Sequence, residues 1–181
     1  MRIETRRLIL REFTEDDWPE LLAYWTDPRY QRFYAEVDDV ERTVRDLVGR
    51  FVASQSEEPR RVWQLAVVRR TDARLIGNCG IRINDPDRRE ANIGYEFAPD
   101  WWGHGYATEA ACAIVRFGFD TCRLHRIWAE CVADNTASAR VLEKLRMRPE
   151  ARFREHRWAK GRWWDTLIYA ILDHEWQPER R

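Results

Sequence analysis

The chain has 181 residues, of which 44% are hydrophobic and 34% are charged. This balance is typical of one folded domain and excludes a disordered chain or an integral membrane protein. The 31 basic and 31 acidic side chains cancel and are interleaved, which argues against a nucleic-acid-binding protein. No apolar run approaches the roughly 20 residues of a membrane span, and the N-terminal residues lack the apolar core of a signal peptide. We therefore predict a single cytoplasmic domain, residues 1–181, that binds neither nucleic acid nor membranes.

The first third of the chain predicts one strand and two helices. Residues 3–13 alternate between apolar and polar, as a half-buried strand does. Apolar side chains recur at helical spacing over residues 18–25, after a capping Thr14, and over residues 40–52. The stretch 29–37 has no clear period.

The rest of the chain alternates between strands and helices, with turns rich in Asp, Pro and Gly between them. The predicted strands are 62–70, 75–84, 91–98, 125–133, 152–159 and 162–171, and the predicted helices are 106–122 and 135–145. The four cysteines have no C-x-x-C spacing, so we expect neither a zinc site nor a redox pair, and no metal.

The stretch DWWGHGYATEA, residues 100–110, joins a strand to a helix through two glycines. A helix N-terminus exposes backbone N–H groups and a partial positive charge, which together bind anions. Gly103 and Gly105 let the backbone approach such an anion, because they have no Cβ. No Lys-Ser or Lys-Thr pair follows, and the third glycine of a dinucleotide fingerprint is missing. The alternative is an ordinary turn with Trp101 and Trp102 in the core.

Two segments, IGYEFAPDWWGHGYATEA (93–110) and LHRIWAECVADNTASARVLEKLRM (124–147), resemble the acetyl-CoA-binding core of the GNAT N-acetyltransferases. ETRRLILREFTEDDWPELL (4–22) resembles the opening of the RimJ/RimL-type branch of that family. The resemblance implies an α/β (α+β) fold with a mixed, mostly antiparallel sheet of about seven strands and about four helices. The sheet is splayed between its fourth and fifth strands, and acetyl-CoA lies in the opening.

The resemblance also implies which residues bind acetyl-CoA. The pyrophosphate rests on the backbone of the glycine loop, which here departs from the family pattern at Asp100, where Gln or Arg is usual. We expect the Asp100 side chain to point away from the phosphates and His104 to face solvent. The implied cofactor-binding residues are Phe97, Gly103, His104, Gly105, Tyr106, Ala107, Thr108, Asn135 and Ser138.

Acetyl transfer requires a group that stabilises the departing thiolate. Many GNAT enzymes use a tyrosine seven residues after the asparagine of the second motif, and here that position is Leu142. Asn135, Ser138 and Leu142 lie on one stripe of the predicted helix, so Ser138 becomes the hydrogen-bond donor by elimination. In the RimJ/RimL-type branch a serine at this place also meets the CoA sulfur. The alternative is that Asn135 only caps the helix and Ser138 is a first-turn hydroxyl.

The amine must also lose a proton before or during the attack. Glu96 on the fourth predicted strand is our candidate base, with Glu130 on the fifth as its rival. An α-amine, with a pKa near ~8, would need neither. Alternation places Tyr95 and Phe97 on one face of the sheet and Glu96 on the other, and the sequence does not tell which face meets the acceptor.

Aromatic side chains from residues 29–37 and from the last hairpin are expected to enclose the acceptor amine. The resemblance suggests a protein N-terminal amine as acceptor, while polyamines and amino-group-bearing drugs are alternatives, and it leaves a homodimer open. Two alternative functions outside the acetyltransferases are a non-catalytic acyl-CoA sensor and a nucleotide-binding protein. The candidate acceptor-binding residues are Tyr30, Phe33, Tyr34 and Trp164, with Trp158 and Trp163 beside them.

Overall fold

The computed structural model describes residues 1–177, and its centre is one sheet of eight strands in the order β1-β2-β3-β4-β5-β6-β8-β7. Every neighbouring pair is antiparallel except β5 and β6, which are parallel. The sheet is therefore mixed and mostly antiparallel, as expected. The strands are β1 (Arg2–Glu4), β2 (Leu8–Glu12), β3 (Val62–Arg69), β4 (Leu75–Asp85), β5 (Glu90–Phe97), β6 (Arg126–Val132), β7 (Arg148–Ala159) and β8 (Arg162–Leu172).

The first predicted strand is wrong in one respect, because residues 3–13 form two strands. β1 folds back on β2, so that Arg2 lies opposite Arg11. Thr5 closes the turn, since its N–H donates to the Leu8 carbonyl at 3.0 Å and its hydroxyl accepts from the Leu8 N–H at 3.0 Å. A local side-chain hydrogen bond of this kind ends a strand without glycine or proline. The sheet accordingly has eight strands rather than seven.

Residues 1–177 contain five α-helices: α1 (Trp18–Trp25), α2 (Pro28–Gln31), α3 (Val40–Ala53), α4 (Tyr106–Asp120) and α5 (Thr136–Lys144). The additional one is α2, a single turn with Pro28 at its first position, where a proline is tolerated because that N–H has no helical partner. Within residues 1–177 no helix is long and apolar enough to cross a membrane.

The helices create two separate cores, one on each face of the sheet. On β3, Leu65 and Val67 join the core under α4, whereas Ala66 between them joins the core under α1 and α3. This is the period-two alternation of a strand that is buried on both faces. The two faces of β5 are divided in the same way, which decides where its functional side chains point.

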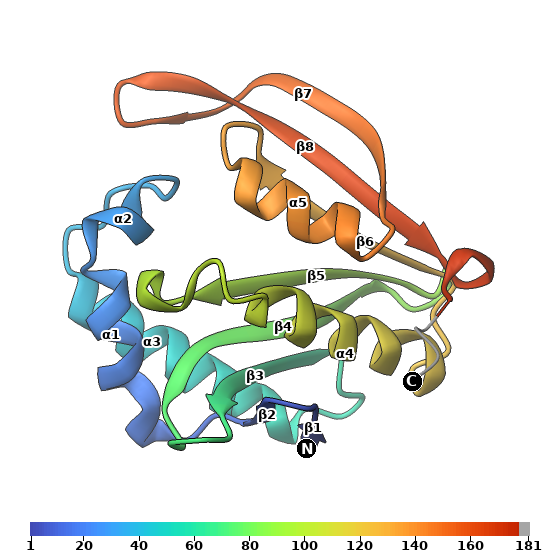
Figure 1. The fold of residues 1–181 in the computed structure, drawn as a ribbon, viewed down its shortest axis with the longest axis horizontal. Coiled ribbons are helices and arrows are strands. Elements are labelled where there is room, and N and C mark those ends of the chain that lie inside the picture. The colour runs from blue at the N-terminus through green and yellow to red at the C-terminus, as the bar shows by residue number, and fades with distance from the viewer. Residues whose placement is uncertain (178–181) are drawn as a thin grey trace.

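β5 and β6 part soon after they meet. Their paired residues run only from Glu90–Arg126 to Asn92–Trp128. Beyond this point β5 continues to Phe97 beside β4, while β6 follows β8 and the long β7–β8 hairpin leans away with α5 (Figure 1). The expected splay between these two strands is therefore present, and it opens toward the N-terminal end of α4.

Candidate functional site

The glycine loop has the backbone that an anion site requires. Gly103 and Gly105 have φ angles of +80° and +78°, a region that residues with a Cβ rarely adopt. A Cβ on Gly103 would have no neighbour within 4 Å, so the space beside the loop is open. In residues 1–177 no protein acceptor is found for the backbone N–H groups from Gly103 to Thr108. The loop and the α4 N-terminus therefore fit a pyrophosphate, which these N–H groups would hold.

A carboxylate in the first turn of α4 is neutralised by its neighbours. Glu109 accepts hydrogen bonds from the Thr5 hydroxyl at 2.6 Å and from the Arg7 Nε at 2.6 Å. Burial alone would raise the pKa of Glu109, but these hydrogen bonds outweigh it and lower the pKa. Arg7 also donates to the His104 carbonyl at 2.9 Å. Arg7, in the turn before β2, thus ties this turn to the glycine loop and balances a charge that would repel phosphate.

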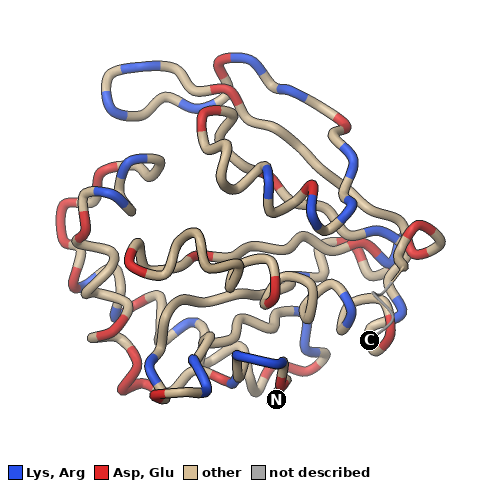
Figure 2. The backbone as a smooth tube through the Cα atoms, in the orientation of Figure 1, with Lys and Arg blue, Asp and Glu red and all other residues tan. Residues whose placement is uncertain are grey.

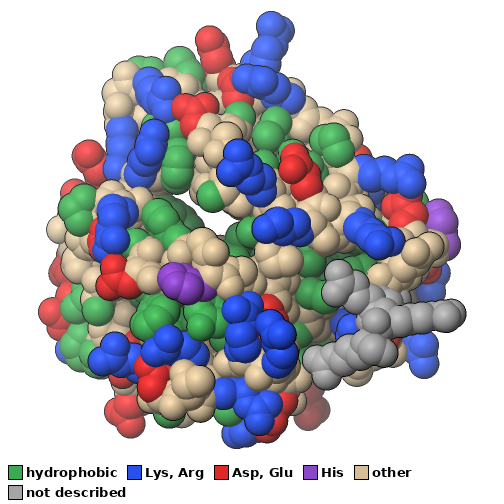
Figure 3. All heavy atoms as spheres, in the orientation of Figure 1, with side chains coloured by type: hydrophobic (Ala, Val, Ile, Leu, Met, Phe, Trp, Pro, Cys, Tyr) green, Lys and Arg blue, Asp and Glu red, His purple; other side chains and the backbone are tan. Residues whose placement is uncertain are grey.

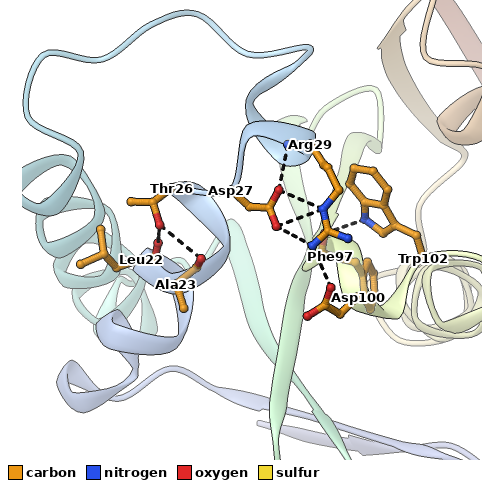
Figure 4. A network of polar contacts seen from close by, with 8 residues as sticks. All are labelled: Leu22, Ala23, Thr26, Asp27, Arg29, Phe97, Asp100 and Trp102. Carbon is orange, nitrogen blue, oxygen red and sulfur yellow. Dashed lines mark hydrogen bonds and ion pairs between the residues drawn. The ribbon is translucent and has the colours of Figure 1, made fainter.

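Asp100, which departs from the family pattern, is also paired. Its carboxylate is exposed and accepts a hydrogen bond of 2.8 Å from Arg29, which also binds Asp27 (Figure 4). The Trp102 indole N–H donates to the Phe97 carbonyl at 2.7 Å. The Phe97 side chain is buried in the core. The structure therefore does not present this side chain for the contact with the cofactor that the sequence suggested.

His104 is exposed, as expected, and does not point into the sheet. Its Nδ1 lies 2.9 Å from the Trp102 carbonyl, and its ring stacks on Tyr106 with centroids 5.8 Å apart. It belongs to the outer wall of the loop.

Ser138 meets a phenol that the sequence did not suggest. Its hydroxyl oxygen is 2.9 Å from the Tyr95 hydroxyl, which also donates to the Ser138 carbonyl at 3.0 Å. Burial raises the pKa of Tyr95, so the phenol keeps its proton. Asn135 caps α5 by accepting the Ser138 N–H at 3.1 Å. Tyr95 therefore bridges β5 and α5 across the splay, with the Ser138 hydroxyl beside it.

We expect Ser138→Ala to lower kcat about ten- to 150-fold, because one hydrogen bond to the thiolate is lost, at about 1.5–3 kcal/mol. Acetyl-CoA binding should change little, since this bond matters most as the sulfur gains charge. The measurement is kcat under conditions where chemistry limits the rate, and an unchanged kcat would remove Ser138 from the mechanism.

Leu142 is not a place where the missing tyrosine can be restored. Its side chain is fully buried among the core residues under α4, so a phenol there would overpack the core. Leu142→Tyr is for this reason unsuitable as a rescue of Ser138→Ala. Tyr95→Phe is the variant that tests a contribution of a phenol to the site.

Glu96 lies on the opposite face of β5 from Tyr95, at the end of a buried polar chain. Asn78 on β4 donates to the Glu96 carboxylate at 3.1 Å and to the Tyr24 hydroxyl at 3.0 Å. Gln64 donates to Asn78 at 2.6 Å and accepts from Arg82 at 2.6 Å. Burial raises the pKa of Glu96, while the Asn78 hydrogen bond limits the rise. A carboxylate with a raised pKa in this position is suited to accept a proton near neutral pH.

Two buried polar atoms face Glu96 without a well-aligned hydrogen bond to any of residues 1–177. The Trp25 indole nitrogen and the Tyr30 hydroxyl form no hydrogen bond of acceptable geometry, yet both lie close enough to Glu96 to stabilise its charge. Because buried donors are normally paired, these two N–H and O–H groups are placed to donate to Glu96 when it is charged. The rival base Glu130 is an exposed partner of Arg157, so the site favours Glu96.

An aromatic groove of about 390 Å³ lies between the segment after α2 and the β7–β8 hairpin. Its aromatic walls are Phe33, Tyr34, Trp158 and Trp164, and Figure 3 shows an opening bordered by hydrophobic side chains in the face that it draws.

Of the four residues predicted to bind the acceptor, Phe33, Tyr34 and Trp164 line this groove. Tyr30 does not line it, because its ring is buried and stacks on Tyr34 with centroids 4.5 Å apart. The exposed Tyr34 ring lines the groove and stacks on Tyr30, whose hydroxyl lies beside Glu96. Trp163 is exposed and packs on Trp158.

The described residues, 1–177, include no group of three or more His, Cys, Asp or Glu side chains able to hold a metal ion. The groups assembled at the splay are instead backbone N–H donors, two hydroxyls and one half-buried carboxylate. Sequence reasoning missed Tyr95, Asn78 and Trp25, whose roles depend on contacts between distant segments.

Comparison with known proteins gives three findings. Residues 7–148 match the family model described as "Acetyltransferase (GNAT) domain". The chain is 34% identical over 176 residues to the uncharacterized N-acetyltransferase YnaD of Bacillus subtilis (strain 168), covering 97% of this chain and 99% of that protein. It is 30% identical over 88 residues to the ribosomal protein uS5-alanine N-acetyltransferase of Escherichia coli (strain K12), covering 49% and 45%.

A solved structure agrees with this. The crystal structure of a GNAT-family acetyltransferase from Bacillus anthracis matches with a TM-score of 0.83 at 31% identity, covering 97% of this chain and 100% of that one.

Proposed function

This chain belongs to the GNAT family and is an acetyl-CoA-dependent N-acetyltransferase, and we propose that its acceptor is a protein N-terminal α-amine in the cytoplasm. The observation that supports this most is the aromatic groove, which adjoins Glu96 through the stacked rings of Tyr34 and Tyr30. One wall of this groove is Trp158, which is 60% exposed. A wall that projects into solvent suits a substrate whose remainder lies outside the protein. The name of the Escherichia coli relative, which acts on a protein alanine, points in the same direction.

The proposed division of labour follows the two faces of β5. On one face Glu96 accepts the proton of the attacking amine, directly or through a water held by Trp25 and Tyr30. On the other face Ser138 donates a hydrogen bond to the sulfur, and Tyr95 orients that hydroxyl. The N–C bond forms as the C–S bond breaks in one ternary complex, and the sulfur leaves as a thiolate that Ser138 stabilises.

Acetyl-CoA itself supplies the activated acetyl group. The chain's part is to position it, through the N–H groups of the loop from Gly103 to Thr108, and to exclude water from the thioester by means of the aromatic walls. A non-catalytic acyl-CoA sensor would need neither a half-buried carboxylate with a raised pKa nor two hydroxyls at the splay.

The experiment is a panel of amines incubated with acetyl-CoA and followed by release of free thiol. It contains N-terminal peptides, polyamines and aminoglycosides. We expect turnover with peptides, acetylated on the α-amine as shown by mass spectrometry. Turnover confined to polyamines or aminoglycosides would favour the alternative, a small-molecule acetyltransferase. If no amine of the panel raised thiol release above the rate measured without an acceptor, amine transfer would be contradicted altogether.

A further inference from the structure

We infer that the aromatic groove selects amines that carry an anionic group close to the reacting nitrogen, such as a peptide N-terminus followed by Asp or Glu. This inference rests on the proposed function, because it specifies the acceptor of the same site. It follows from the charges on the two walls of the groove.

Three cations line the groove, and none of its lining residues is acidic. They are Arg32, Arg157 and Lys160, and the remaining lining side chains besides the aromatic ones are Ala35, Val132 and Ala159. The cations come from both walls, the segment after α2 and the β7–β8 hairpin. Figure 2 shows basic residues at the hairpin end and on the facing segment.

Two of the three cations are not neutralised. Within residues 1–177 Arg32 forms no ion pair; its guanidinium lies over the Phe33 ring, 5.2 Å from the centroid. Lys160 donates to the Gln31 carbonyl at 2.7 Å, which engages one of its three hydrogens and leaves its charge uncompensated. Arg157 is paired with Glu130. The groove therefore has a net positive rim from Arg32 and Lys160.

The Lys160–Gln31 hydrogen bond also connects the two walls of the groove. It joins the hairpin end to α2 over a sequence separation of 129 residues. Phe33 and Trp164 connect the same two walls through an edge-to-face contact with ring centroids 6.1 Å apart. A substrate that enters between these walls passes close to both positive charges.

The positive rim should make the groove discriminate between acceptors by their charge. A polycation such as a polyamine or an aminoglycoside brings like charges to Arg32 and Lys160 and is disfavoured. An amine with an adjacent carboxylate or phosphate has an attractive partner on the rim, while its nitrogen faces the Glu96 side. Because Arg32 and Lys160 are exposed, the preference depends on ionic strength.

The test uses three peptides with the same first residue and length, whose positions two to four are Glu, Gln or Lys. At low salt we expect kcat/KM to fall from Glu to Gln to Lys, with about tenfold or more between the extremes, and the difference to shrink as salt screens the rim. A second arm uses small amines with and without a carboxylate or phosphate, which separates a peptide source of the anion from a small-molecule source.

Variants assign the preference to the rim. Arg32→Gln and Lys160→Gln should each reduce the Glu-over-Lys ratio several-fold, and Arg32→Lys, which keeps the charge, should retain it. Arg88→Gln is the control, since Arg88 is also an exposed arginine but lies on the β4–β5 turn, outside the groove, and its loss should leave the ratio unchanged.

Acetylation of all three peptides with equal kcat/KM, or an unchanged ratio in both glutamine variants, would overturn the inference while leaving the proposed function intact. Absence of acetyl transfer to every acceptor would instead refute the proposed function. The two failures therefore give different results.

Discussion

Glu96→Gln is expected to lower kcat/KM about 100- to 10,000-fold, the range that a positioned general base contributes. Glutamine has nearly the same shape and still accepts the Asn78 hydrogen bond, but it cannot take a proton from the amine. Because the side chain is half-buried and its pKa is raised by loss of solvent, a neutral amide should not destabilise the fold. The measurement is steady-state kinetics at a fixed pH, together with a thermal melt to show that the variant is folded.

The control for this variant is Glu130→Gln. Glu130 is exposed and pairs with Arg157 at the surface, so its loss should change kcat/KM only a little. Similar losses in both variants would mean that the effect is not specific to Glu96. A fully active Glu96→Gln enzyme would show that the amine loses its proton without the help of Glu96.

Gly105→Val is expected to weaken CoA binding about 100-fold or more. A valine Cβ at this position would lie 3.5 Å from Arg7, and the φ of +78° is one that a β-branched residue adopts only with strain. The loop would have to change shape, and loss of two amide contacts to a charged phosphate at about 1.5–3 kcal/mol each corresponds to this change in Kd. Calorimetric titration with CoA measures it directly.

Gly161→Val separates strain from binding in that experiment. Gly161 has a similar φ of +69° with open space around it, but it lies at the β7–β8 turn, away from the glycine loop. Both variants should lower the melting temperature of the protein without ligand. Only Gly105→Val should lose CoA affinity, and a Gly105→Val protein that binds CoA like the parent would show that the loop is not the phosphate site.

The order of the elements and the glycine loop could be predicted from the sequence because their signals are local. Helical spacing identified α1 and α3, while the glycine loop and Asn135 marked the starts of α4 and α5. The two glycines that were expected to let the backbone approach an anion have positive φ angles. The break between β1 and β2 was missed because its cause is a side-chain hydrogen bond of Thr5, for which no glycine or proline gives a signal.

The candidate site was only partly predictable, because its chemistry depends on contacts between distant segments. Alternation on β5 placed Glu96 and Tyr95 on opposite faces but did not tell which face each helix covers. Asn78 is 18 positions from Glu96 and Tyr95 is 43 positions from Ser138. The pairing of β4 with β5 and the position of α5 decide both contacts, and neither can be derived from spacing within one segment.

The pH dependence of kcat/KM, measured with two acceptors whose amines have different pKa values, tests the role of Glu96 most directly. A carboxylate acts as a base only when it has lost its proton, so the rate should rise with pH through the pKa of Glu96 and then level. Burial raises that pKa, which places the rise above the ordinary glutamate range near about 4.3. The account predicts that this rise occurs at the same pH for both acceptors and is absent in Glu96→Gln. A rise that shifts with the pKa of the acceptor amine and persists in Glu96→Gln would contradict it.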